Sequence, residues 1–500
     1  MLSIAGSRGS VPLQTDHSIE PPGGPRYRLA TLPCRPSQSH SIASLAARCA
    51  ALAAVVVAFG TACKPDWFPS SRESDRGADE AAATTTGSDP GSASRAGNSS
   101  EASHSGQSDG KPADRTVVAA AKMPVRRVRG LWVLAEGSVR VLDDPARVTP
   151  LLERASRLGV TDLFVQVYRG GRAFYPADPA FERAPAVGKF AVDPLARLIH
   201  DAHARGLRVH AWVNVLSLST RRDAKLLADL GRDAIHVDRR GRSLLDYPEL
   251  DLPEPDRQFY RMGTPGLYLD PAVASVRTRL VATFRDLVVR YPELDGLHLD
   301  YIRHPDLLPF IPGSRFGVGL EFGYGELSRA RYRAETGRPD PIVGAPPGVV
   351  RDSEAWDEWR RLQVTTLVEE IASTTRSVRP GLILSAAVIP YVERCYLSLA
   401  QDWPRWLASG AIDRAIPMVY TLDDQLLRYQ LEGYTGLTGS DRIWPGLGVW
   451  LFESNPARAL AQLAELRRLQ FSGEVLFSDD AIAQSPALLE ALAAGAPTAP

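Results

Sequence analysis

Cysteine is scarce in this chain, which has only four in 500 residues. Cys34 and Cys49 precede an apolar segment that resembles a signal peptide, which leaves Cys63 and Cys395. This number of cysteines is too small for a disulfide framework. The folded part must therefore depend on a hydrophobic core. Cys395 has no C-x-x-C partner, and we predict a buried or incidental thiol there rather than a nucleophile.

An excess of either charge is also missing. Lys plus Arg and Asp plus Glu both number 58, so no overall field attracts polynucleotides or an anionic membrane surface. We therefore expect no nucleic-acid partner.

Several catalytic motifs are absent as well. The one G-x-S-x-G sequence, at 106–110, lies in a Ser- and Gly-rich stretch without the strand and helix that a nucleophile elbow requires. Gly170-Gly171 and Gly317-Val318-Gly319 lack the context of a phosphate loop. Four histidines are scattered rather than clustered as metal ligands: His200, His203, His210 and His298. Of these, His200 and His203 fall on a helix that we expect to pack outside the barrel, away from the site. We expect no cofactor and no metal site.

The segment from Ser41 to Cys63 has an apolar core with basic residues upstream, a pattern typical of signal peptides. It is too short to span a membrane comfortably. Gly60-Thr61-Ala62-Cys63 resembles the cleavage box of bacterial lipoproteins, although Gly60 stands where that box usually has Leu. We predict lipidation at Cys63, an extracytoplasmic location and anchoring to a membrane. The alternatives are ordinary secretion or an uncleaved anchor and, last, a cytoplasmic protein. The long stretch before the apolar core favours a translation start downstream of Met1.

From Ser70 to about Ala121 the sequence is rich in Ser, Gly, Ala and Thr and has almost no large apolar residues. Such a segment buries too little surface to offset the entropy of ordering, so we expect a flexible tether. The predicted organisation is a signal or lipoprotein segment at 1–63, a linker at 64–124 and a folded domain at 125–500.

After Gly130 short β-rich runs alternate with amphipathic stretches, which indicates β/α units. Strands are expected at 130–135, 161–168, 207–214, 294–300, 382–389, 414–420, 443–450 and 474–478. Helices are expected at 145–158, 192–205, 276–291, 353–378, 403–409, 456–469 and 486–493. Eight regular units favour a closed (β/α)8 TIM barrel over an open doubly wound sheet. Two long insertions, at 215–274 and 306–351, interrupt the pattern.

The sharpest chemical signal is Leu294 to Pro305, which reads L-D-G-L-H-L-D-Y-I-R-H-P. Asp300 follows a buried strand, and burying an acid is costly unless it has a partner or a task. We therefore predict that Asp300 is catalytic. The alternative is an ion pair with Arg303 that only fixes the loop.

Barrel enzymes build their sites at the C-terminal ends of the strands. The polar residues expected there are Glu136, Gln166, Arg169, Arg172, Asn214, Asp300, Arg303, Tyr420, Glu453, Asp479 and Asp480. Flat aromatic surfaces are available from Trp132, Tyr168, Trp212, Tyr301 and Trp450, although any one of them is more often a core residue. Together such groups suit sugar rings, which stack on aromatic faces while their hydroxyls need paired donors and acceptors.

Glycoside hydrolysis needs two carboxyl groups, one protonated and one ionised. Asp300 is the better ionised member, since Arg303 is expected to lower its pKa. Glu453 is the first choice for the acid. Glu136, Glu393 and Asp479 remain open as alternatives.

Five blocks of sequence, at 129–133, 164–175, 193–214, 268–271 and 295–305, together resemble the glycosyl-hydrolase-like family ten. These are bacterial (β/α)8 proteins, many of them lipoproteins. The resemblance implies a glycoside hydrolase acting on a cell-envelope polysaccharide, and one branch cuts peptidoglycan strands stripped of their peptides. Five positions match the family's polar strand ends: Gln166, Arg169, Asn214, Asp300 and Arg303. With the aromatic residues Tyr301, Tyr420 and Trp450, they form the predicted substrate-binding set.

The family-eighteen chitinases have a related motif, but this chain lacks their catalytic acid. Their motif D-G-x-D-x-D-x-E aligns with 295–302 and puts Ile302 where their catalytic Glu stands, so the chitinase mechanism does not transfer. The predicted function is hydrolysis of a cell-envelope polysaccharide, most simply the peptidoglycan backbone. Two alternatives stay open: a barrel that binds glycan without cutting it, and a hydrolase of a secreted exopolysaccharide.

Overall fold

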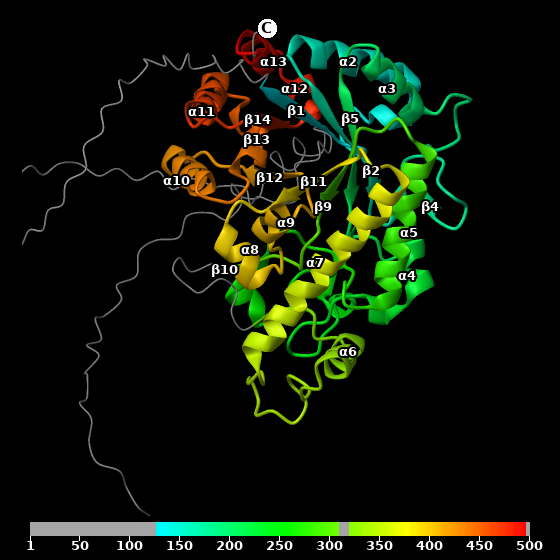
Figure 1. The fold of residues 1–500 in the computed structure, drawn as a ribbon, viewed down its shortest axis with the longest axis vertical. Coiled ribbons are helices and arrows are strands. Elements are labelled where there is room, and N and C mark those ends of the chain that lie inside the picture. The colour runs from blue at the N-terminus through cyan, green and yellow to red at the C-terminus, as the bar shows by residue number, and fades with distance from the viewer. Residues whose placement is uncertain (1–126, 310–319, 497–500) are drawn as a thin grey trace, which may run out of the picture. The chain divides into compact units, whose positions relative to one another are not determined.

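The computed structural model describes residues 127–309 and 320–496. Within them, eight parallel strands form a closed barrel. The barrel strands are β1 (Val128–Val133), β2 (Asp162–Arg169), β5 (Arg208–Asn214), β9 (Gly296–Asp300), β11 (Ile383–Val388), β12 (Arg414–Val419), β13 (Gly446–Gly448) and β14 (Gly473–Phe477). The predicted (β/α)8 fold is confirmed (Figure 1).

Closure is visible in the pairing of the first strand. β1 pairs in parallel with β2, where Leu131 lies opposite Leu163, and with β14, where Leu131 lies opposite Leu476. The remaining strands follow in chain order around the ring. Because β1 has a neighbour on each side, the sheet has no open edge there, and the doubly wound alternative is wrong.

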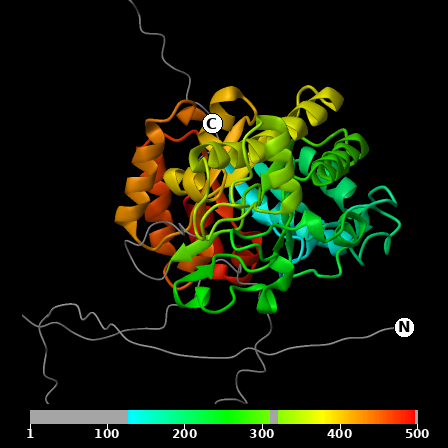
Figure 2. The ribbon, with the colours of Figure 1, turned by 90° about the horizontal axis from the view of Figure 1, so that it is seen from below.

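Helices surround the barrel (Figures 1 and 2). They are α2 (Val148–Arg157), α3 (Pro194–His203), α5 (Ala274–Arg290), α7 (Ser353–Val378), α8 (Val392–Ser398), α9 (Trp403–Ser409), α10 (Asp424–Thr435), α11 (Pro456–Arg468), α12 (Asp479–Gln484) and α13 (Pro486–Ala494). The sequence predicted the helical segments to within a few residues, except α8, α10 and α12, which it did not delimit. Several begin where a capping signal stands: the Asp193 carboxylate accepts from the Leu195 N–H (3.0 Å), with Pro194 in the first turn.

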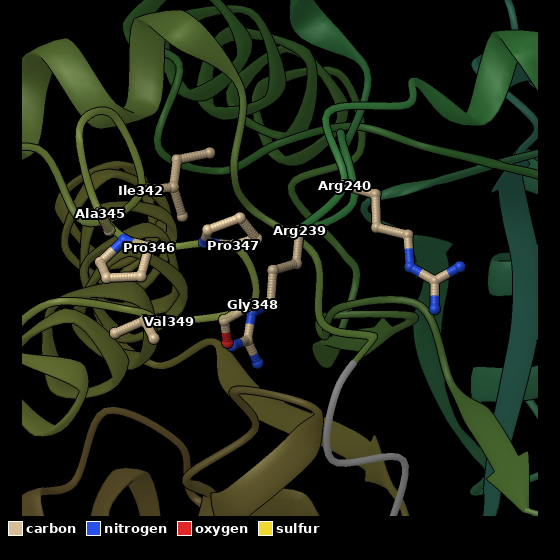
Figure 3. A pocket seen from close by; sticks show the side chains of 8 residues that line it. All are labelled: Arg239, Arg240, Ile342, Ala345, Pro346, Pro347, Gly348 and Val349. Atoms are coloured by element: carbon tan, nitrogen blue, oxygen red, sulfur yellow. The ribbon is translucent and has the colours of Figure 1, made fainter. Parts of the chain in front are cut away.

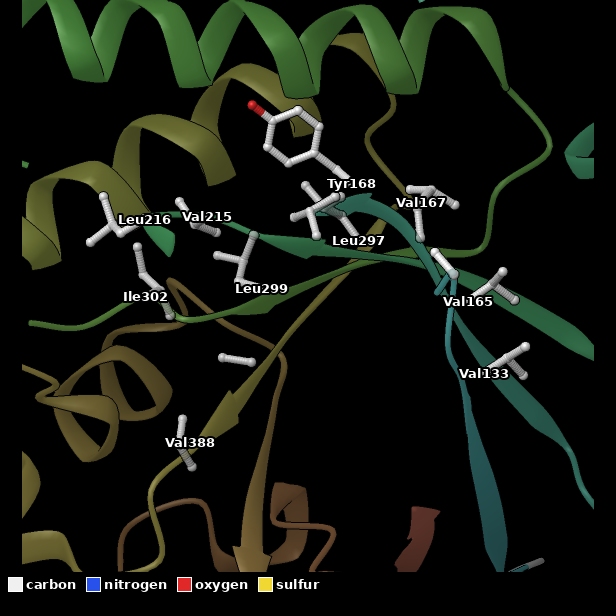
Figure 4. Packing of buried hydrophobic residues seen from close by; sticks show 14 of the residues in the cluster. Val133, Val165, Val167, Tyr168, Val215, Leu216, Leu297, Leu299, Ile302 and Val388 are labelled. Atoms are coloured by element: carbon white, nitrogen blue, oxygen red, sulfur yellow. The ribbon is translucent and has the colours of Figure 1, made fainter. Parts of the chain in front are cut away.

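Alternate residues of each strand face opposite sides of the barrel wall. Leu297 and Leu299 of β9 belong to the outer core and lie beneath the helices (Figure 4). His298 lies between them in sequence and faces inward, where its imidazole ring packs 5.9 Å from that of Trp132. The inner core is smaller and more aromatic, and consists of Trp132, Phe164, Trp212, Ala387, Ile416, Trp444, Val475 and Phe477.

The aromatic interior requires a glycine on β13. A Cβ added at Gly446 would lie 2.5 Å from Cη2 of Trp132, so any side chain there would displace the indole. The short strand and its glycines also explain an error in the prediction. The expected strand at 443–450 is paired regularly only at Gly446–Gly448, and Val449–Phe452 forms a 3-10 turn instead.

The two insertions fold against each other. The first contains β6 (Ser217–Ser219), α4 (Lys225–Leu230), β7 (Tyr260–Met262) and β8 (Leu267–Tyr268), and the second contains β10 (Leu307–Pro309) and α6 (Glu326–Thr336). β7 pairs with β10 in antiparallel fashion, so that the insertions share a two-stranded sheet. Two short strands extend the sheet beside the end of β2: β3 (Arg172–Ala173) pairs with β2 in antiparallel fashion, and β4 (Glu182–Arg183) pairs with β3 in parallel.

The predicted signal segment, linker and lipidation site at Cys63 lie outside the described residues. In the part that the structure describes, no helix combines the length and apolar character needed to cross a bilayer. Cys395 is a buried free thiol, as predicted.

Candidate active site

Asp300 is the last residue of β9, and its carboxyl is held at both oxygens. The Trp212 indole N–H donates to Oδ2 (3.0 Å), and the Tyr301 backbone N–H donates to Oδ1 (2.7 Å). The side chain is 6% exposed. These contacts fix the orientation of the carboxyl at the C-terminal end of a barrel strand, where barrel enzymes place their reacting groups.

The acidity of Asp300 differs from the prediction. Burial raises the pKa of its carboxyl from 3.8 to about 6, against the smaller lowering effects of the Tyr301 N–H, the Arg303 charge and the Trp212 indole. The expectation that Arg303 holds this pKa down was therefore wrong in its net direction, because desolvation exceeds the attraction of the arginine. A carboxyl with a pKa near 6 exchanges protons at neutral pH, which suits general acid–base catalysis.

The backbone beside Asp300 is strained. Tyr301 has φ 51°, in the left-handed region that a bulky residue rarely occupies. The Arg303 guanidinium lies over the Tyr301 ring, 5.0 Å from its centroid, and also donates to the His304 carbonyl (3.3 Å). Strain of this kind persists only where the surroundings enforce it, and it is concentrated at functional sites.

Two predicted amides lie next to Asp300 along the strand ends. Gln166 Nε2 donates to Asn214 Oδ1 (3.1 Å), and the Ala135 N–H donates to Gln166 Oε1 (3.3 Å). Asn214 is the register partner of Asp300 between β5 and β9. The structure therefore brings Gln166, Asn214 and Asp300 together in a row across three adjacent strands.

Arg169 is paired with a second carboxylate, and its charge also acts on Asp300. Its guanidinium lies 3.1 Å from Glu136, which also lies 3.8 Å from Arg172. The positive charge of Arg169 also acts on Asp300 and lowers its pKa. Glu136 at the end of β1 and Asp300 at the end of β9 thus share one arginine.

Tyr420 follows β12 and forms another side of the site. Burial, and then the neighbouring charge of Asp300, raises the pKa of the Tyr420 hydroxyl well above 10. Its ring packs 5.5 Å from that of Phe477, and both Tyr420 and Trp450 pack against the aromatic interior. The phenol is therefore a neutral hydrogen-bonding group close to Asp300.

Beneath the site, His298 is locked in one protonation state. Trp132 Nε1 donates to His298 Nε2 (3.0 Å), which leaves Nδ1 to bear the proton and to donate to Ser385 Oγ (2.9 Å). Burial lowers the pKa of His298 well below 6.5. This neutral ring supports the site from below rather than supplying a charge.

The other candidate acids have different surroundings. Glu453 is exposed at the end of the Val449–Phe452 turn, and Glu393 is exposed on α8. Asp479 is fully buried and accepts two hydrogen bonds from Arg154 on α2 (2.9 and 2.7 Å). Asp480 accepts from Ser138 Oγ and the Val139 N–H. Among these candidate acids, Glu136 is the one whose ion-pair partner, Arg169, also acts electrostatically on Asp300.

Two predicted aromatic surfaces are core residues. Tyr168 faces outward from β2 and packs edge-on against Phe284 of α5, with ring centroids 5.5 Å apart. Trp132 is 1% exposed inside the barrel. A bulge in the pairing of β2 with β5, between Gln166 and Tyr168, contributes to the outward turn of Tyr168, and no sequence pattern announces it.

The histidines do not assemble a metal site. His200 is exposed on α3, and His203 lies 2.8 Å from Asp295. His210 lies 2.9 Å from the buried Asp162 carboxylate. Among the described residues no group of three or more His, Cys, Asp or Glu side chains is placed to hold a metal ion.

One hollow lies away from the strand ends. It measures about 470 Å³ and is lined by Arg239, Arg240 and residues of the loop at 342–349 (Figure 3). Its arginines are already engaged: Arg239 donates to the Gly348 carbonyl, and Arg240 lies 2.7 Å from Asp256. No carboxylate lines it, so it offers no acid–base chemistry.

The described domain is similar to known proteins. The model of the family described as "Glycosyl hydrolase-like 10" matches residues 127–430, which include Asp300 and every residue placed around it above except Trp450 and Phe477. The chain is 23% identical over 287 residues to glycosyl hydrolase DigH of Escherichia coli K12, and 24% identical over 322 residues to glycosyl hydrolase YngK of Bacillus subtilis. These matches cover 54% and 59% of this chain, and 56% and 54% of the relatives, so the chain spans about half the length of the curated relatives it matches.

Among solved structures, the glycoside hydrolase domain of PgaB (BpsB) from Bordetella bronchiseptica has the same fold. The superposition has a TM-score of 0.53 at 16% identity and covers 75% of this chain and 100% of that domain. Since the family model matches more than half of the chain, the chain belongs to the glycosyl hydrolase-like family 10.

Proposed function

We propose that this protein is a glycoside hydrolase that cuts the glycan backbone of peptidoglycan, with Asp300 as its central carboxyl. The observation that carries the proposal is the state of Asp300: buried at a strand end, fixed at both oxygens, and with a pKa of about 6. The family, and relatives named as glycosyl hydrolases, support the reaction class.

The arrangement suggests a role for Asp300. Each carboxyl oxygen has two acceptor positions, so the bonds from Trp212 and Tyr301 leave room for a proton that points toward a substrate. With a pKa of about 6, the group can donate a proton to a departing sugar oxygen and recover it from water. We assign to Asp300 the acid–base role, which replaces our expectation that it stays ionised throughout.

The second carboxyl is assigned to Glu136. It lies at the end of β1, and its partner Arg169 also acts on Asp300. The ion pair with Arg169 fixes the orientation of this carboxylate, as a nucleophile or base requires. Glu453 was the first choice from the sequence; its exposed position makes it the second choice here.

Gln166, Asn214 and Tyr420 supply the polar surface for the substrate. Amides and a neutral phenol both donate and accept hydrogen bonds, which matches the hydroxyl and acetamido groups of an N-acetylated glycan. Tyr301 and Arg303 shape the loop after β9, and Trp450 adds an aromatic side chain at the edge. We propose that this surface binds the sugar units on either side of the cleaved bond.

We also propose that the barrel is anchored outside the cytoplasm through a lipid on Cys63 and the linker that follows it. The sequence pattern around Cys63 carries this proposal. A tether on a membrane-held anchor would let the domain reach a polymer of the cell envelope.

The test is a panel of polymers offered to the purified protein. Peptide-free peptidoglycan strands, intact peptidoglycan, chitin oligosaccharides and a secreted exopolysaccharide are each assayed for new reducing ends. The proposal requires cleavage of the peptide-free strands. Cleavage of the exopolysaccharide alone would assign the enzyme to the other class of polymer, and binding without cleavage of any polymer would identify a glycan-binding barrel.

A further inference from the structure

A small pocket opens beside the Asp300 site, between the barrel and the insertions. One wall is formed by Arg261 and Leu308, which are register partners on the paired strands β7 and β10. The opposite wall comes from the segments that follow β11 and β12, and from α10. It consists of Ile389, Pro390, Tyr391, Arg394, Met418, Tyr420, Thr421 and Gln430.

The pocket is next to the reacting group because of Tyr420. This residue lines the pocket, and the pKa of its hydroxyl responds to the charge of Asp300. In the barrel order, β11 and β12 directly follow β9, which carries Asp300. A group that occupies the pocket would therefore lie beside Tyr420, close to Asp300. In the proposed reaction, such a group would belong to a sugar near the bond that is cut.

The pocket measures about 160 Å³, whereas pockets that enclose whole drug-sized ligands measure about 300–1,000 Å³. It suits one substituent of a sugar rather than an oligosaccharide. Ile389, Pro390 and Met418 give it apolar surface suited to a short hydrocarbon group.

Two polar groups in the pocket could each bind a ligand: the Arg261 guanidinium and the Gln430 amide oxygen. The Arg261 guanidinium makes no ion pair with any carboxylate in the described part of the chain, whereas the neighbouring Arg394 is paired with the buried Asp306. The Gln430 side chain is 5% exposed and is hydrogen-bonded to that of Tyr391, and its Oε1 has no hydrogen-bond partner among the described residues. An arginine fits a carboxylate, and an amide oxygen accepts from a hydroxyl or an amide N–H.

We propose that this pocket binds a carboxylate-bearing substituent of the substrate, with the carboxylate on Arg261 and its short carbon chain against Pro390 and Met418. The inference rests on the proposed function, because a glycan must supply the substituent. In peptidoglycan strands without peptides, the ether-linked lactyl group of N-acetylmuramic acid has this chemistry: one carboxylate, one methyl group and one C–H. When a peptide is attached, that carboxylate is an amide, so the pocket selects strands from which the peptide has been removed.

The experiment measures binding, so that it is independent of cleavage. The full chain carrying Asp300→Asn, which prevents turnover, is titrated by calorimetry with a tetrasaccharide of alternating N-acetylglucosamine and N-acetylmuramic acid. The same tetrasaccharide with its carboxylates converted to methylamides, and chitotetraose, which lacks the lactyl group, serve as matched ligands. Arg261→Gln is compared with Arg285→Gln, which removes the same charge from an exposed position on α5.

The free-acid tetrasaccharide is expected to bind about tenfold more tightly than the methylamide or chitotetraose, as one charge-assisted hydrogen bond would provide. Arg261→Gln should abolish that difference, and Arg285→Gln should preserve it. Equal affinity for the acid and the methylamide, an undiminished preference in Arg261→Gln, or binding of none of these ligands would overturn the inference. Tighter binding of a hyaluronan tetrasaccharide, whose carboxylate is on the sugar ring itself, would assign the pocket to uronic acids and would also overturn it. Failure of hydrolysis with a retained carboxylate preference would contradict the proposed function alone.

Discussion

Trp212 of β5 donates its indole N–H to the carboxyl of Asp300 across the boundary between two barrel strands, at 3.0 Å. The bond favours the charged form of a carboxyl that burial otherwise disfavours. Two strands far apart in sequence thus jointly set the acidity of the group on which the proposed chemistry depends.

Replacing Trp212 with Phe removes this bond and should raise the pKa of Asp300 above 6, because a hydrogen bond to the ionised form is lost. The ionisation that we expect near pH 6 in the profile of kcat/KM should move to higher pH. Trp406→Phe is the matched control, since it breaks a buried indole bond to Thr365 Oγ1 (2.9 Å) between helices outside the barrel. An unmoved profile in Trp212→Phe, or an equal shift in the control, would exclude this coupling.

Asp300 should also affect stability in a way that depends on pH. Its pKa is higher in the folded state (about 6) than its ordinary value of 3.8, so the folded protein binds this proton more tightly than the unfolded chain. The stabilising contribution of the Asp300 carboxyl to the free energy of unfolding is therefore largest below pH 4, and it is lost as the pH rises through 6.

In Asp300→Asn this loss is absent. From pH 4 to pH 7, the stability of the variant relative to the wild type should therefore increase, by at most about 3 kcal/mol. Denaturant unfolding of both proteins at each pH measures the difference. The exposed carboxylate of Asp233 provides the comparison, and Asp233→Asn should show much less of this trend. A relative stability of Asp300→Asn that is constant with pH would contradict the raised pKa.

Replacing a proposed catalytic carboxyl group should lower kcat, whereas replacing an exposed carboxyl group should not. Glu136→Gln is expected to reduce kcat by about 100-fold, as loss of a catalytic carboxyl does. Glu393→Gln, on the surface of α8, should retain wild-type kcat. Full activity of Glu136→Gln combined with inactivity of Glu453→Gln would return the second role to Glu453.

Anchoring is tested in cells rather than with the purified domain. Cys63→Ala should shift the protein from the membrane fraction to the soluble fraction, since the lipid attachment point is lost. Acylated peptide at Cys63 should be found by mass spectrometry in the wild type. A Cys49→Ala variant controls for loss of a thiol in the same region. Unchanged fractionation of Cys63→Ala would exclude the lipid anchor.

Much of the fold follows from the sequence because its signals are local. The helices 353–378 and 403–409 have the predicted bounds, since the apolar spacing that predicts a helix is set within a few residues. Asp300 was found in the same way, as an acid that ends an alternating strand. By contrast, β13 was overestimated because Pro445, Gly446 and Gly448 allow little regular pairing, and the apolar run around them resembles a strand.

What could not be predicted depends on residues that meet only in the folded state. The pKa of Asp300 was misjudged because Arg303 is near in sequence, whereas the burial that dominates comes from other strands. The Glu136–Arg169 pair joins the ends of β1 and β2. The pocket at Arg261 needs the pairing of two insertions with each other. None of these relationships has a sequence spacing that would announce it.

The most direct test of the central role of Asp300 is the release of reducing ends from peptide-free peptidoglycan strands by the wild type and by Asp300→Asn, compared at pH 6. The account predicts steady release by the wild type, and a rate at least about 100-fold lower for the variant, with circular dichroism and strand binding retained. Cleavage by Asp300→Asn at the wild-type rate would contradict the account.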